Sequence, residues 1–172
     1  MTDAAPGSQE LSSTYDQLCT SYRAIDDFRA KLLGFLPLAT GGGIFLALNT
    51  KVDLRTEFLL PVGLFGLAVT LGLFSYEIYG IRKCHALILA GTALEKDLGL
   101  KAGQFIDRPR AVFGLVNEPF AASIIYPAVI AAWGYLALAL IDRLAAGTVA
   151  AVLFAAGMSF TLWYARRLAR EG

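Results

Sequence analysis

Acidic and basic side chains are missing from four long stretches of this sequence. No Asp, Glu, Lys, Arg or His occurs in residues 32–50, 58–76, 119–141 or 144–165. Charged types make up only 17% of the chain and apolar types 56%, whereas a soluble domain is about one quarter charged. A helix needs about 20 mostly apolar residues to cross a hydrocarbon core of ~30 Å. The sequence therefore predicts an all-α integral membrane protein with four transmembrane helices.

Other features are scarce as well. The N-terminus lacks a basic segment leading into a short apolar run and a cleavage site, so no removable signal peptide is expected. The net charge of +1 argues against a nucleic-acid surface. The two cysteines, Cys19 and Cys84, are expected on the cytoplasmic side, where thiols stay reduced and a structural disulfide does not form.

The basic residues predict the orientation. Twelve of the 15 Lys and Arg residues fall on one side of the predicted spans, and only Lys51, Arg55 and Arg143 fall on the other. Because basic loops stay in the cytoplasm, we expect a multi-pass protein of the cell (inner) membrane with both termini cytoplasmic. The outer links, 51–57 and 142–143, are so short that each pair of spans must form an antiparallel hairpin.

An apolar stripe precedes the first span. Residues 1–7 are small and polar and are expected to be disordered. After them, apolar residues recur at spacings of four and three, which is a heptad pattern broken only by Arg29. The stripe consists of Leu11, Tyr15, Leu18, Tyr22, Ile25 and Leu32. This pattern predicts an amphipathic cytoplasmic helix that packs either against the protein's own second cytoplasmic helix or against another subunit.

The second span is expected to continue into the cytoplasm. No Gly-Pro cluster interrupts residues 76–98, and Gly99 is well placed to end the helix. Residues 8–99 should therefore form a hairpin whose two helices extend into a cytoplasmic stalk. The connector, residues 100–118, mixes apolar and basic residues, so it either lies at the lipid headgroups or docks on the stalk. Residues 119–172 would form the second hairpin and a basic C-terminal tail.

The spans also lack the groups that chemistry in a membrane requires. Ion-coupled transporters, pumps and intramembrane proteases need ionisable side chains within the apolar zone, so no catalytic residue, metal or cofactor is expected. Cys84 and the only histidine, His85, are adjacent and point ~100° apart on a helix, which is unsuitable for one metal ion. A zinc site shared with Cys19 between subunits is disfavoured. His85 is either a pH sensor or an interface histidine.

A headgroup-modifying enzyme is a third and weaker hypothesis. It would have to draw its catalytic residues from the connector, which offers Gln104, Asp107, Arg108 and Arg110.

Two carboxylates lie where spans meet the cytoplasm. Glu77 and Glu118 could form rings at a pore mouth in an oligomer, or they could form local salt bridges. Arg29 and Lys31 are the candidate partners of Glu77 on the neighbouring helix, and Arg82 and Lys83 are candidates on its own helix.

Small residues mark further candidate sites. Pro37, Gly41, Gly42 and Gly43 in the first span indicate either a close helix contact or a hinge that lines a pore. In the fourth span, small residues four apart form a ridge for helix packing or oligomer contacts, namely Gly147, Ala151, Ala155 and Ser159.

The organisation of the first hundred residues resembles that of SLATT-type bacterial membrane effectors. The resemblance lies in the heptad of residues 15–25, the hairpin around LNTKVDLRTE and the exit helix EIYGIRKCHALILAGTALEKDLG. It implies an oligomer that perforates the membrane. The hairpin that starts at Pro119 departs from that two-span plan. Four-span membrane components of phage-defence systems also resemble this chain in their overall organisation.

Two functional hypotheses follow. The first is a homo-oligomeric pore or membrane-disrupting effector in bacterial defence. The second is a non-conducting anchor or sensor that recruits a cytoplasmic protein partner through its stalk.

Overall fold

The computed structural model describes residues 6–49, 56–108, 118–139 and 141–171. Its elements are four α-helices: α1 (Pro6–Asn49), α2 (Thr56–Asp97), α3 (Glu118–Leu138) and α4 (Arg143–Glu171). The all-α prediction is confirmed. Of the segment expected to be disordered, residues 1–5 lie outside the described ranges, and α1 begins at Pro6.

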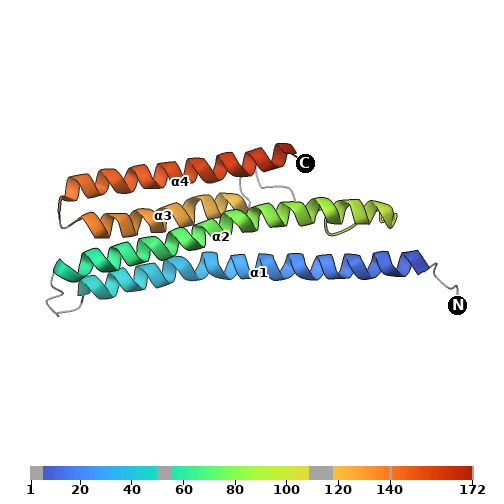
Figure 1. Ribbon diagram of the computed structural model, residues 1–172, viewed down its shortest axis with the longest axis horizontal. Coiled ribbons are helices and arrows are strands. Elements are labelled where there is room, and N and C mark those ends of the chain that lie inside the picture. The colour runs from blue at the N-terminus through green and yellow to red at the C-terminus, as the bar shows by residue number, and fades with distance from the viewer. Residues whose placement is uncertain (1–5, 50–55, 109–117, 140, 172) are drawn as a thin grey trace.

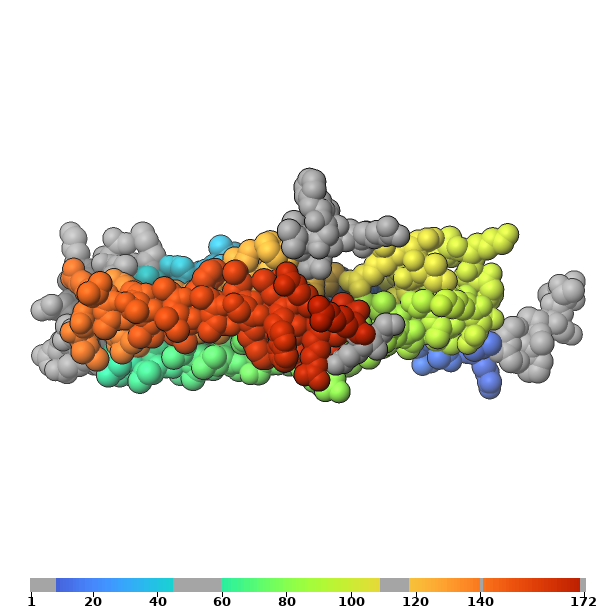
Figure 2. Space-filling view, turned by 90° about the horizontal axis from the view of Figure 1, so that it is seen from above, coloured from blue at the N-terminus to red at the C-terminus, as the bar shows by residue number. Residues whose placement is uncertain are grey.

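The helices lie side by side along one long axis (Figure 1), and consecutive helices run in opposite directions. With 44 and 42 residues, α1 and α2 are about 66 and 63 Å long, twice the ~30 Å of a hydrocarbon core. The later part of α2 and the segment after it extend beyond the end of α4 (Figure 2). We call residues 9–28 of α1 together with residues 81–108 the stalk.

Three of the helices, α2, α3 and α4, are long and apolar enough to cross a membrane. They contain the second, third and fourth of the predicted spans. Over the residues described, α1 is not among them. Side chains are described only for residues 32–44 of its predicted span, 32–50, and this stretch is shorter than the 18 residues required of a span.

Helix ends follow the local sequence. Gly99 has a φ of 67°, and its amide donates to the carbonyl of Lys96 at 3.0 Å, which confirms the predicted C-cap of α2. At the start of α4, Asp142 Oδ1 accepts hydrogen bonds from the amides of Leu144 and Ala145 at 2.8 and 3.3 Å, as an N-cap does. Pro37 lies inside α1 without ending it.

Two apolar cores lie in succession along the molecule. In the stalk core, Cys19 and Tyr22 of α1 pack with Cys84 of α2 and with Phe105, and Tyr15, Leu18 and Ile25 surround them. Four members of the heptad stripe, Tyr15, Leu18, Tyr22 and Ile25, thus pack within the chain, against its own second stalk helix. The bundle core contains Leu36 of α1 and three residues of α3, namely Ala122, Tyr126 and Val129.

Candidate functional site

Arg29 lies between the two cores, at the position where it interrupts the heptad stripe. Its side chain is buried on the face of α1 that meets α2. Opposite it lies Gly80, where an added Cβ would stand 3.2 Å from Arg29 Cδ. The glycine therefore allows the aliphatic stem of the arginine to lie directly against α2.

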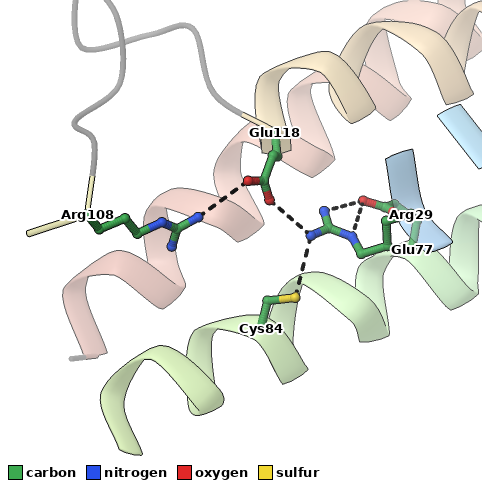
Figure 3. Close-up of polar contacts among 5 residues, drawn as sticks. All are labelled: Arg29, Glu77, Cys84, Arg108 and Glu118. Atoms are coloured by element: carbon green, nitrogen blue, oxygen red, sulfur yellow. Dashed lines mark hydrogen bonds and ion pairs between the residues drawn. The ribbon is translucent and has the colours of Figure 1, made fainter. Parts of the chain in front are cut away.

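The guanidinium of Arg29 forms a buried ion pair with Glu77. Arg29 Nε and Nη2 both donate to Glu77 Oε1, at 3.0 and 2.5 Å. The two side chains are only 3% and 0% exposed. Figure 3 shows the two contacts between them. Glu77 thus has the partner on α1 that the sequence suggested, whereas Lys31 pairs with Asp27 on its own helix at 2.6 Å.

The remaining nitrogen of the guanidinium, Nη1, contacts two further residues. Arg29 Nη1 lies 3.3 Å from Glu118 Oε2 at the start of α3 and 3.6 Å from Cys84 Sγ on α2. Glu118 Oε1 in turn lies 3.5 Å from Arg108 Nη2. One cation therefore joins α1, α2 and α3 where the apolar runs end, and Arg108 ties in the segment after α2. We call these five residues the Arg29 junction.

The ion pair with Glu77 keeps the Arg29 guanidinium charged. Burial alone would lower the pKa of Arg29, but the hydrogen bonds and the charge of Glu77 outweigh burial and raise the pKa. Burial raises the pKa of Cys84, and the nearby Arg29 only partly opposes that effect. Cys84 is therefore a protonated thiol at neutral pH, which is a poor nucleophile. The junction is built to hold helices together.

A second buried carboxylate, Glu95, anchors the start of the connector to the stalk. It accepts hydrogen bonds from the hydroxyl of Tyr15 at 2.7 Å and from the amides of Phe105 and Ile106 at 3.0 and 2.7 Å. Burial would raise the pKa of Glu95, but these three donors together lower it. For residues 100–108 the structure thus shows the docked alternative; residues 109–117 lie outside the described part.

Phe105 completes this anchor. Its ring meets Tyr15 and Tyr22 edge to face, with centroids 6.3 and 5.5 Å apart, and it fills the space where a Cβ on Gly91 would stand. Glu95 is not among the site residues predicted from the sequence, although the sequence carries a signal for it. It follows Ile88 and Gly91 and precedes Leu98 at helical spacing, so it interrupts the stripe of α2 as Arg29 interrupts that of α1.

The glycines predicted to form a hinge or pore lining face outward. Nothing lies within 4 Å of a Cβ built on Gly41 or Gly42, and Gly43 approaches only Trp133, at 3.9 Å. Pro37 is exposed on the same helix. Within the described part of the chain, the glycine triplet therefore makes no close helix contact.

The small-residue ridge of α4 also faces outward. All four members are exposed: Gly147, Ala151, Ala155 and Ser159. The side of α4 that packs on α3 is a different one, where Ala146 and Thr161 are buried and Gly157 lies against Pro127. Of the stalk stripe, Leu11 is half-buried, while the next four members pack on or in the stalk core.

Two fully buried polar atoms in the bundle have no hydrogen-bond partner among the described residues. They are Glu77 Oε2 and the hydroxyl of Tyr126. Across the same ranges, His, Cys, Asp and Glu side chains do not gather in groups of three that could hold a metal ion.

The chain was compared with protein-family models, curated proteins and solved structures, and no match was found in any of the three comparisons. The function therefore has to be inferred from the residues of this chain.

Proposed function

We propose that this chain is a four-span protein of the cell (inner) membrane with both termini in the cytoplasm, and that several copies assemble into a pore or membrane-disrupting oligomer. In this arrangement α1 crosses the membrane together with α2, α3 and α4. The stalk lies on the cytoplasmic side, which carries most of the basic residues, and bacterial defence is the setting that the resemblance in organisation implies.

The proposal rests on one observation. The small-residue ridge of α4 and the glycines of α1 both face outward. In lipid, helices associate mainly through close packing and backbone approach, and small residues permit that approach. Among the described residues, the ridge of α4 and the glycines Gly41 and Gly42 of α1 meet no other helix of the same chain. A second copy would bury the ridge of α4, and a closed oligomer would enclose Gly41 and Gly42 around its axis.

The glycine face also supports a conducting role. The predicted spans contain no Asp, Glu, Lys, Arg or His, so any polar lining must come from neutral polar side chains or from the backbone. A helix face without side chains leaves carbonyl groups uncovered, and uncovered carbonyls can line a water-filled path. In an oligomer with α1 at the axis, Gly41 and Gly42 would face that path.

The test combines oligomeric state in mild detergent with ion flux from liposomes. Ala151→Leu adds bulk on the ridge and should yield smaller assemblies and lower flux. Ala156→Leu, also at an exposed position but ~140° further round the helix, is the matched control and should behave as the wild type. A wild-type protein that stays monomeric and never conducts would contradict the proposal.

The anchor or sensor role remains a second candidate, because the stalk projects beyond α3 and α4 (Figures 1 and 2). Its outward face carries Ser13 and Gln17, both exposed, where a partner could bind. Replacing both with arginine should leave flux unchanged if the protein is a pore. If the protein is an anchor, the wild type assembles without conducting, and the same double variant loses its partner.

A further inference from the structure

A cavity of about 370 Å³ opens beside the Arg29 junction. Its walls come from the first stalk turns of α2, the start of α3 and the last turns of α4. Both polar and apolar side chains line it, among them His85, Arg108, Glu118, Phe120, Leu162 and Arg166. The cavity is not part of the proposed pore or of the stalk core.

The cavity lies at the depth where the helices leave the apolar zone. Arg166 follows Trp163 and Tyr164, and this order of aromatic and then basic residues is typical of the membrane–water boundary. On α3, the lining residue Phe120 is in the first turn. On α2, the lining begins one turn beyond Glu77. An occupant would therefore be in contact with lipid headgroups.

The charge of the lining favours an anion. Three arginines face the cavity, Arg29, Arg108 and Arg166, against one carboxylate, that of Glu118. Arg29 and Arg108 already share Glu118, and Arg29 also pairs with Glu77. Arg166 is exposed and forms no salt bridge to the described carboxylates within 4.0 Å, so it is the cation most free to bind a ligand.

We infer that this cavity binds the phosphate headgroup of an anionic phospholipid from the adjoining leaflet. Basic pockets between membrane helices bind such headgroups, and Arg166 with His85 would contact the phosphate. The apolar walls at Phe120 and Leu162 would cover the first part of an acyl chain. A soluble phosphate would leave these walls in water, which is why the lipid is the occupant that fits.

The inference rests on the membrane insertion in the proposed function but not on pore formation. The test places the protein in nanodiscs of equimolar phosphatidylcholine and phosphatidylglycerol, followed by mild detergent extraction and native mass spectrometry. The wild type should retain phosphatidylglycerol preferentially. Arg166→Gln should reduce that preference about fivefold, the factor that corresponds to ~1 kcal/mol per basic side chain near an anionic surface.

Arg170→Gln is the matched control. It removes the same charge from the same helix end, but Arg170 does not line the cavity, so the lipid preference should persist. Equal losses in both variants would overturn the inference, because they would indicate general surface charge. Retention of neither lipid by the wild type would also overturn it, as would displacement of the bound lipid by soluble glycerol phosphate.

Failure of the lipid site can be distinguished from failure of the proposed pore. A protein that inserts and retains phosphatidylglycerol through Arg166, yet stays monomeric and never conducts, would remove the pore and leave the lipid site. Helix content and elution volume of both variants should match the wild type, so a loss of lipid cannot be ascribed to unfolding.

Discussion

Arg29 and Glu77, 48 positions apart in the sequence, form an ion pair with an Nη2–Oε1 distance of 2.5 Å, and both side chains are buried. The pair lies between the stalk core and the bundle core. Desolvating two charges costs several kcal/mol per ion, and that cost is offset only while both partners are present. The pair is therefore weak evidence for overall stability but a strong constraint on how α1 and α2 align.

Glu77→Gln should destabilise the protein strongly, because it leaves the Arg29 guanidinium buried without its main counter-charge. Breaking a buried pair costs ~3–5 kcal/mol, and the remaining contact with Glu118 at 3.3 Å favours the lower end. Thermal unfolding in detergent measures the loss. Asp27→Asn breaks the exposed pair with Lys31 and should cost at most ~1 kcal/mol; similar losses in both variants would contradict the role given to the buried pair.

The docking of residues 103–106 on the stalk should weaken in acid. Because the pKa of Glu95 is lowered, its contribution is present above the ordinary carboxyl pKa of 4.5 and is lost as the pH falls through the lowered value. Amide exchange of Phe105 and Ile106, corrected for intrinsic rates, should therefore accelerate at low pH. In Glu95→Gln the exchange should already be fast at neutral pH and should no longer depend on this titration.

The same anchor should also weaken in alkali. The hydrogen bond to Glu95 raises the pKa of Tyr15, with burial adding to the effect. Stability from the neutral hydroxyl is therefore complete below the ordinary tyrosine pKa of 10.0 and is lost as the pH rises through the raised value. Tyr15→Phe should remove this alkaline transition and keep the acid one. Persistence of the alkaline step in that variant would show that another group causes it.

Gly91→Ala should displace the ring of Phe105. A Cβ at this position would overlap the ring, and overpacking of a formed core typically costs ~1–3 kcal/mol. Gly34→Ala is the control, because nothing lies within 4 Å of its added Cβ, and it should change the free energy of unfolding by no more than ~1 kcal/mol. Chemical denaturation of both variants measures the difference, and equal effects would show that Phe105 is not held against α2.

Tyr126→Phe should leave stability unchanged or raise it slightly. Its hydroxyl is fully buried and finds no partner among the described residues, so removing it forfeits no hydrogen bond there. Thr70→Val is the contrast, since the buried Thr70 hydroxyl donates to the carbonyl of Gly66 at 2.7 Å, and its loss should cost ~1 kcal/mol. A clear loss in Tyr126→Phe would show that this hydroxyl is satisfied in the membrane.

Much of the fold follows from the sequence without knowledge of any contact. Long runs without charge predict membrane-spanning helices from composition alone, and α2, α3 and α4 bear this out by length and composition. The C-cap at Gly99 follows from local backbone sterics. The stalk follows from periodicity, and Arg29 is conspicuous as the one charge in an apolar stripe.

The partners in the junction and the directions of the small-residue surfaces were decided only by the tertiary structure. Glu77 had four candidate partners, and the tertiary structure pairs it with Arg29, 48 positions away. Arg29 also reaches Glu118, 89 positions away. Glu95 accepts a hydrogen bond from Tyr15, 80 positions away. The ridge of α4 faces outward. Periodicity defines which residues share a face, but the rotation of each helix about its axis depends on packing against all its neighbours together, and that information is not local to any segment.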